Sequence, residues 1–189
     1  MTSSWPPYIL EQFDTIAPQV GQHDATEYYG PYNGLLAELF PSSEHFMIVP
    51  PHKHPGHPHA GVDDFPTSFI VRRDEHPVFF VEIKPSSHLD TITTRNAADR
   101  EMRERFEALS TRVKIPTLYG ISAIGTNICV YAYQTESGEI APRVIEKDAR
   151  TVEDGVPVTR WRLDITTAEG EQRIWEIVNE VKVMCSRQL

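Results

Sequence analysis

Two charged residues, Glu82 and Lys84, stand two positions apart in the otherwise apolar run VFFVEIKP. In a β-strand, residues two apart project from the same face, so a carboxylate and an ammonium group would lie side by side. Both groups are costly to bury without a partner. We therefore expect this face either to meet solvent at a strand end or to face a charged partner.

A third charged residue, Asp64, begins the preceding run DFPTSFIVRR, and the polar stretch DEHP separates the two runs. Their β-branched and aromatic residues predict an antiparallel hairpin. With a turn centred near Glu75, antiparallel counting places Thr67 opposite Lys84. A bulge at Pro66 would bring Asp64 closer. Two carboxylates and an ammonium group would then meet at one end of the hairpin.

Such a cluster is typical of a site for a hard divalent cation. Mg²⁺ takes one or two carboxylates, keeps several waters, polarises a phosphoryl oxygen and lowers the pKa of a bound water. A neighbouring lysine would orient that water or offset charge at the phosphorus. The residue types therefore predict phosphodiester hydrolysis with Mg²⁺ or Mn²⁺ held by Asp64 and Glu82, and with Lys84 at the attacking water.

The elements that must position these residues follow from hydrophobic spacing. Helical spacing of apolar residues predicts helices over residues 7–16, 24–40, 96–110 and 168–185. Gly30-Pro31 interrupts the second of these, which is consistent with two short pieces. Strand-like runs cover residues 45–51, the hairpin, and both sides of Gly125-Thr126-Asn127. We expect residues 135–159 to form a loop with one short strand near Val144.

Length and composition favour one domain over residues 1–189, because 189 residues with 40% hydrophobic and 24% charged side chains are typical of a single globular unit. The order helix, strand, strand, strand, helix, strand, strand, helix predicts an α/β (α+β) fold. We expect a central mixed sheet with helices on its faces.

The order of these elements around Asp64 and Glu82-Ile83-Lys84 resembles the restriction-endonuclease-like PD-(D/E)xK nuclease superfamily, whose core is αβββαβ. The segment IPTLYGISAIGTNICVYAY is similar to the hairpin that follows the core helix in type I restriction subunits. The resemblance covers residues 24–133. It implies that residues 134–189 are an extension ending in a closing C-terminal helix.

The resemblance implies that Asp64, Glu82 and Lys84 are the catalytic residues of a metal-dependent nuclease. It also implies an auxiliary metal-binding glutamate on the first core helix, for which Glu27 is our first choice and Glu38 our second. Members of the superfamily that keep the fold without catalysis leave a second reading open. In that reading the chain is a binding or regulatory module with a protein partner, and Glu82 only pairs with Lys84.

Two further features bear on the resemblance. Asp63 stands before Asp64, where the superfamily has a proline. The segments YYGPYNGLLAELFP and HPVFFVEIKP also resemble small fungal proteins, a resemblance that implies no activity.

The charge distribution limits how nucleic acid could bind. With 18 basic and 27 acidic residues the net charge is -9, which argues against coating DNA, RNA or anionic lipid by bulk electrostatics. A local basic group follows the candidate site, comprising Arg95, Arg100, Arg103, Arg105, Arg112 and Lys114. We predict phosphate contacts from Arg95, Arg100 and Arg103. Interleaved glutamates leave open a solvated face of intrahelical ion pairs, formed with Glu101, Glu104 and Glu107.

A histidine-rich loop supplies an alternative metal site. PHKHPGHPHAG carries His52, His54, His57 and His59, and imidazole is a common ligand of zinc and nickel. Because proline and glycine give the segment no fixed geometry and it has no cysteine, we expect weak binding only. The loop ends just before Asp64 and could form a lip over the site.

The cysteines and the start of the chain predict a cytoplasmic or nuclear location. We expect Cys129 and Cys185 to be buried thiols, because a chain of this size needs no disulfide framework. The opening MTSSWPPYILEQFD lacks the basic and apolar regions of a signal peptide, and no apolar run approaches the roughly 18 residues of a membrane span.

Overall fold

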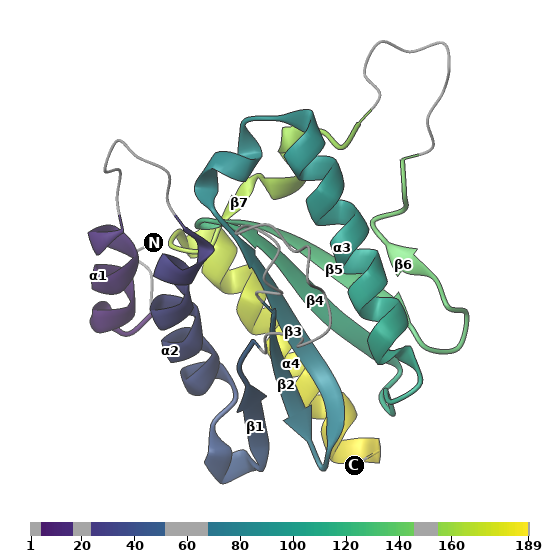
Figure 1. Ribbon diagram of the computed structural model, residues 1–189. Coiled ribbons are helices and arrows are strands. Elements are labelled where there is room, and N and C mark those ends of the chain that lie inside the picture. Colours follow the sequence, from purple (N-terminus) through teal and green to yellow (C-terminus); the bar gives the residue numbers. More distant parts are fainter. Residues whose placement is uncertain (1–4, 17–23, 52–67, 146–154, 189) are drawn as a thin grey trace.

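The computed structural model describes residues 5–16, 24–51, 68–145 and 155–188 (Figure 1). Within these ranges the longer helices are α1 (Pro7–Thr15), α2 (Tyr29–Leu39), α3 (Ile92–Ser110) and α4 (Ala168–Gln188). The strands are β1 (Phe46–Val49), β2 (Ser68–Arg73), β3 (His76–Lys84), β4 (Thr117–Ile124), β5 (Asn127–Gln134), β6 (Ile140–Ala141) and β7 (Leu163–Asp164). Single 3₁₀ turns lie at Ala25–Tyr28, Ser42–Glu44, Ser86–Leu89 and Val158–Trp161.

The described strands form one mixed sheet in the order β1-β2-β3-β4-β5-β6, and β7 also pairs with β5. β3 and β4 are parallel, because α3 carries the chain back across the sheet between them, and the other neighbours are antiparallel. This arrangement confirms the predicted α/β (α+β) class. The elements from α2 to β4 follow the predicted αβββαβ order.

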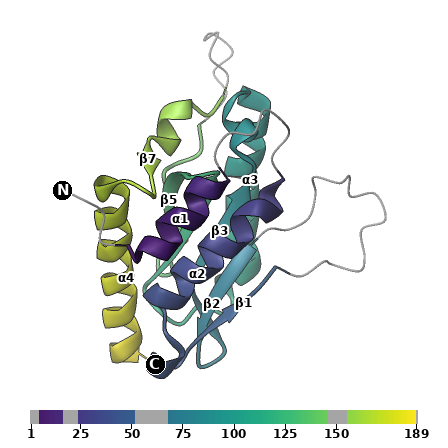
Figure 2. The ribbon, with the colours of Figure 1, turned by 90° about the vertical axis from the view of Figure 1, so that its left-hand side faces the viewer.

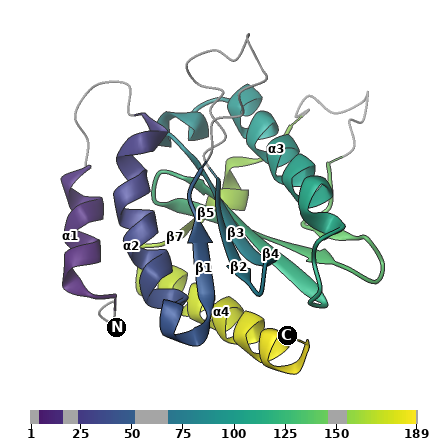
Figure 3. The same ribbon diagram turned by 60° about the horizontal axis from the view of Figure 1, so that its bottom comes forward.

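Helices cover both faces of the sheet. Figures 1 and 3 show α3 on one face and α4 on the other, and Figure 2 shows α1 and α2 side by side between the viewer and the sheet. Alternate residues of β3 supply the two faces. Phe79 packs against Phe40 just after α2 with tilted rings, while Phe80 packs edge-on against Phe106 of α3. Both layers are buried in one hydrophobic core.

A glycine sets how closely α3 approaches the sheet. A Cβ on Gly120 of β4 would lie 2.4 Å from the Phe80 ring and 2.9 Å from Met102 Cε. Such contacts are shorter than van der Waals packing permits, so only glycine allows Phe80 and Met102 to fill this space. The charged residues of β3 therefore lie directly beneath the helix.

The predicted helices are confirmed, with two adjustments: α3 begins at Ile92, four residues before its predicted start, and the second helix is divided. Residues 24–40 form the 3₁₀ turn Ala25–Tyr28 followed by α2, so the break falls before Tyr29. Gly30 and Pro31 lie in the first turn of α2, where proline is tolerated because its missing N–H has no helical acceptor there.

Two details of the strand prediction are wrong. Counting from a turn at Glu75 pairs Ser68 with Ile83, whereas Ser68 lies opposite Glu82. The turn is Asp74–Glu75, with Arg73 opposite His76, so it is centred earlier than expected, and the register shift between Val71 and Arg72 offsets only part of the difference. The short strand expected near Val144 is β6, which begins at Ile140 and pairs with β5 near its end.

The remaining structural predictions concern cysteines and membrane spans. Cys129 and Cys185 are both buried free thiols, as predicted. Of the helices that the structure describes, none combines the length and the apolar character needed to cross a lipid bilayer.

Candidate functional site

Glu82 and Lys84 lie on the face of β3 that α3 covers. Their exposed fractions are 2% and 6%, so the pair is buried. Of the two arrangements expected from the sequence, the structure adopts the one in which the pair faces charged partners. Those partners come from α3 and β2.

Four contacts join the charged residues of β3 to their neighbours. Lys84 Nζ forms an ion pair with Glu101 of α3 and lies 3.9 Å from Glu82 Oε1. Arg105 Nε lies 3.7 Å from Glu82 Oε2, and Ser68 Oγ donates a hydrogen bond to the same carboxylate oxygen. We call Ser68, Glu82, Lys84, Glu101 and Arg105 the Glu82 cluster.

Local geometry explains why these five residues meet. Glu101 and Arg105 are four apart on α3, so they share one helix face and lie one turn from each other. That face lies over β3, where Glu82 and Lys84 point toward the helix. Pairing of β2 with β3 brings Ser68 opposite Glu82. Two carboxylates balance two cations, which reduces the electrostatic cost of burying Glu82 and Lys84 beside the partly exposed Glu101 and Arg105.

The structure describes only some of the metal ligands predicted from the sequence. Asp64 lies outside the described residues, as do His52, His54, His57 and His59. Glu27 lies exposed on the 3₁₀ turn Ala25–Tyr28, which contacts β3. Glu38 accepts a hydrogen bond of 2.8 Å from Tyr8 Oη of α1, a contact between the two N-terminal helices.

The donor set in the Glu82 cluster suits a hard cation in type but is small. Among the described residues, no three histidine, cysteine, aspartate or glutamate side chains gather as a metal site. Glu82 and Glu101 provide two carboxylates next to one ammonium group. One or two carboxylates with several waters is the usual environment of Mg²⁺ in proteins. Because Glu101 is ion-paired with Lys84, Glu82 is the carboxylate of the cluster that would hold Mg²⁺ or Mn²⁺, with water completing the coordination.

The three arginines predicted to contact phosphates have different surroundings. Arg95 donates hydrogen bonds to the carbonyl oxygens of Val156 and Leu89. Arg103 donates to Asp99 and to a backbone carbonyl, whereas Arg100 is 66% exposed and pairs with a glutamate on its own helix. Two of the three guanidinium groups thus hold chain segments together, and Arg100 faces solvent.

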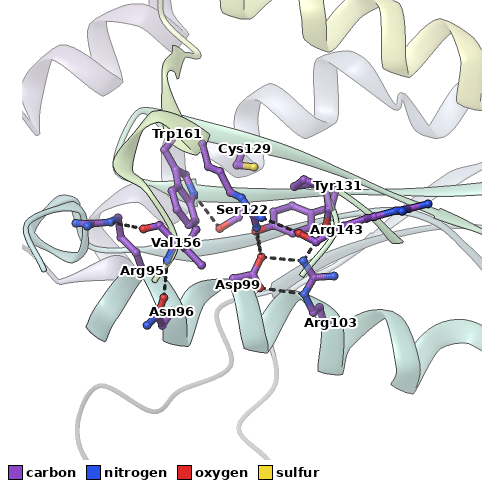
Figure 4. Close-up of polar contacts among 12 residues, drawn as sticks. Arg95, Asn96, Asp99, Arg103, Ser122, Cys129, Tyr131, Arg143, Val156 and Trp161 are labelled. Atoms are coloured by element: carbon purple, nitrogen blue, oxygen red, sulfur yellow. Dashed lines mark hydrogen bonds and ion pairs between the residues drawn. The ribbon is translucent and has the colours of Figure 1, made fainter. Parts of the chain in front are cut away.

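A second charged cluster lies on the same face of the sheet, centred on the buried Asp99 of α3 (Figure 4). Asp99 Oδ1 accepts hydrogen bonds of 2.6 Å from Arg160 Nη1 and 2.8 Å from Tyr131 Oη. Asp99 Oδ2 accepts one of 2.9 Å from Arg103 Nε. The arginines also donate to the carbonyl oxygens of Pro142 and Arg143. We call Asp99, Arg103, Tyr131 and Arg160 the Asp99 cluster.

Sequence reasoning missed Ser68, Glu101, Asp99, Tyr131 and Arg160 as site components, and it assigned Arg103 to phosphate, whereas Arg103 pairs with Asp99. One signal was available, because Asp99 is three residues from Met102 and so places a carboxylate in the apolar stripe of α3. Such a residue needs buried partners. Its partner Arg160 is 61 positions away and could not be identified from spacing.

Burial controls the acidity of the groups beside Asp99. It raises the pKa of the Cys129 thiol to about 11, although the positive charge of Arg160 acts in the opposite direction. Burial, with Cys129 and Asp99 close by, holds the pKa of Tyr131 well above its usual range. Both groups are therefore neutral near pH 7, and neither is an activated nucleophile.

Comparisons of this chain with family models, with curated proteins and with solved structures find no match.

Proposed function

We propose that this chain is a nuclease-like protein that hydrolyses phosphodiester bonds of nucleic acid with Mg²⁺ or Mn²⁺. The observation that carries the proposal is the buried juxtaposition of Glu82 and Lys84 beneath α3, with Glu101 beside the lysine. The αβββαβ order of elements that presents this pair supports the proposal, since it is the order that the sequence resemblance implies.

Each residue of the site has a proposed role. Glu82, with Asp64 and Glu27, would hold the cation, which when bound supplies charge at a phosphoryl oxygen and acidifies a water. Lys84 places a positive charge 3.9 Å from the Glu82 carboxylate, where it would orient the attacking water and offset charge at the phosphorus. Burial beneath α3 excludes bulk water and strengthens these charge interactions.

A cleavage assay tests the proposal. The purified chain would be incubated with single-stranded and duplex DNA and with RNA, in Mg²⁺ or Mn²⁺. Lys84→Ala is expected to lower the cleavage rate by about 10²- to 10⁴-fold, the range typical of a lost catalytic group. Lys114→Ala removes an exposed lysine and is the matched control, expected to cleave like the native chain. Equal rates for the native chain and Lys84→Ala would exclude the enzyme.

A second candidate function is a binding or regulatory module without catalysis. It is favoured by one observation, namely that Glu82 already has Ser68, Lys84 and Arg105 around its carboxylate. In this case the cluster only stabilises the fold, and a protein partner would bind elsewhere.

Calorimetric titration with Mn²⁺ separates the two functions. A nuclease is expected to bind the cation, and Glu82→Gln to lose most of that binding because a neutral amide oxygen is a weaker ligand. The module is expected to give no binding heat, with or without the substitution. Binding that survives Glu82→Gln unchanged would place the metal site elsewhere.

We also propose a cytoplasmic or nuclear location. Cys129 and Cys185 are free thiols, which is typical of proteins in reducing compartments. Imaging a fluorescent fusion of the chain would test this location, and secretion would contradict it.

A further inference from the structure

Arg105 differs from the other arginines packed around α3. Arg95, Arg103 and Arg160 each donate hydrogen bonds to carbonyl or carboxylate oxygens at 3.1 Å or less. The Nε atom of Arg105 is buried and has no hydrogen-bond partner among the described residues. Its ion pair with Glu82 is 3.7 Å long, which exceeds hydrogen-bond distance.

Native structures give almost every buried N–H group a hydrogen-bond partner, so a buried N–H group without one is unusual. The carboxylate oxygen across this ion pair, Glu82 Oε2, already accepts a hydrogen bond from Ser68 Oγ. The Arg105 side chain is 24% exposed, so part of it can be reached from outside the chain. The unused donor is buried beside Glu82 in the candidate site, and the side chain that carries it is partly open to a ligand.

The chemistry of the donor indicates the ligand. A guanidinium group is a planar fork that matches the oxygens of phosphate, and its charge persists at any pH at which the protein is folded. We propose that Arg105 binds a phosphate of the nucleic-acid backbone beside the bond to be cleaved. We further propose that Glu82 retains Arg105 until a divalent cation occupies the Glu82 carboxylate.

This inference rests on the proposed function and adds its regulation. Without a cation, the negative charge of Glu82 competes with phosphate for Arg105. With a cation on Glu82, that competition weakens and the guanidinium becomes available. Cation and nucleic acid therefore bind cooperatively, and the coupling passes through one ion pair.

The test measures binding rather than cleavage. Fluorescence anisotropy would follow labelled DNA and RNA oligonucleotides with phosphorothioate linkages, which slow their cleavage, with and without Mg²⁺. Arg105→Met is expected to weaken binding about 10- to 100-fold with Mg²⁺, the value of one charge-assisted hydrogen-bonded contact. Without Mg²⁺ the two proteins are expected to bind alike. In Mg²⁺, the slope of log affinity against log salt concentration should be shallower for Arg105→Met than for the native chain, by the equivalent of about one phosphate contact.

Two further variants control for folding and for general charge. Arg173→Met removes a partly exposed arginine of α4, on the other face of the sheet (Figure 1), and is expected to bind like the native chain. Arg105→Lys keeps the charge without the fork and is expected to recover part of the affinity. Thermal melting of each variant would confirm that the fold is retained.

The outcomes separate this inference from the proposed catalysis. Equal affinities of the native chain and Arg105→Met in Mg²⁺ would overturn the inference. It would also be overturned if Arg105→Met lost as much affinity without Mg²⁺ as with it, or if the native chain did not bind the oligonucleotides. If the native chain cleaves nucleic acid while Arg105→Met keeps full affinity, only this inference fails. If Mg²⁺-dependent binding requires Arg105 but no cleavage occurs, the inference stands and the catalysis fails.

Discussion

The two charged clusters beneath α3 differ in how completely their groups are paired. In the Asp99 cluster, the carboxylate accepts hydrogen bonds from Arg103, Tyr131 and Arg160 at 2.6 to 3.1 Å. In the Glu82 cluster, the arginine stands 3.7 Å from the carboxylate, and its Nε has no hydrogen-bond partner within the described residues. Both clusters are buried against the same sheet, so burial alone does not account for the difference.

We interpret the Asp99 cluster as a structural tie between chain segments and the Glu82 cluster as the candidate ligand site. The Asp99 cluster joins α3 and β5 to the carbonyl oxygens of Pro142 and Arg143, which fixes chain segments far apart in the sequence. The Glu82 cluster joins only adjacent elements and retains an unused donor. The proposed cation and phosphate site relies on this incomplete pairing, beside the buried Glu82 carboxylate and the partly exposed Glu101 carboxylate.

Breaking the Asp99 cluster is expected to cause the largest loss of stability. Asp99→Ala leaves the largely covered Arg103 and Arg160 without their carboxylate, and removal of one partner from a buried ion pair typically costs about 3–5 kcal/mol. Urea denaturation followed by tryptophan fluorescence measures the free energy of unfolding.

A matched substitution on the same helix controls for helix propensity and charge. Glu104→Ala removes a carboxylate that is 64% exposed and pairs with Arg100, so its expected cost is only about 0–1 kcal/mol. If Asp99→Ala cost no more than Glu104→Ala, the Asp99 cluster would not be a structural tie.

A smaller effect is expected for the Lys84–Glu101 pair. A double-mutant cycle with Lys84→Met and Glu101→Gln is expected to give a coupling free energy of about 0.5–3 kcal/mol, the range for contacting charged residues. The exposed pair Arg162–Glu169 is the control, for which about 0.2–1 kcal/mol is expected. Equal coupling for the two pairs would mean that Glu101 does not hold Lys84.

The sequence was sufficient to predict the fold class and the order of the main elements. The stripe of apolar residues in α4 and the β-branched runs of β2 and β3 are strong periodic signals. The two-residue strands β6 and β7 carry no periodicity, and β7 was not predicted. The predicted hairpin register was off by one residue, because hydrophobic spacing does not fix which polar residues form the turn, and the turn is Asp74–Glu75.

The site could be predicted only within one strand. Spacing placed Glu82 and Lys84 on one face, and the structure confirms it. Spacing could not show that Glu101 and Arg105 lie above them, because tertiary packing determines how α3 is rotated against the sheet. That packing depends on the absent Cβ of Gly120, which lies 36 positions after Lys84.

Raising the pH is expected to have the smallest effect on stability. It acts on the Cys129 thiol, which lies beside the Asp99 cluster. Burial raises the pKa of Cys129 from 9.0 to about 11, so the unfolded chain loses this proton before the folded chain does. The unfolded state then binds fewer protons, and stability falls as the pH rises from 9 toward 11. Below that window the thiol is neutral in both states and contributes no pH dependence.

The expected loss from this thiol is about 1 kcal/mol between about pH 8 and about pH 10. It can be measured as the change in the free energy of unfolding in urea, comparing the native chain with Cys129→Ala. The packing lost in the variant is the same at every pH, so it cancels from the change with pH, and the variant is expected to lose less stability. Identical pH dependence in both proteins would show that the thiol ionises alike in the folded and unfolded chains. The face of β5 beside Asp99 would then be more open to water than the structure indicates, and the contrast with the Glu82 cluster would weaken.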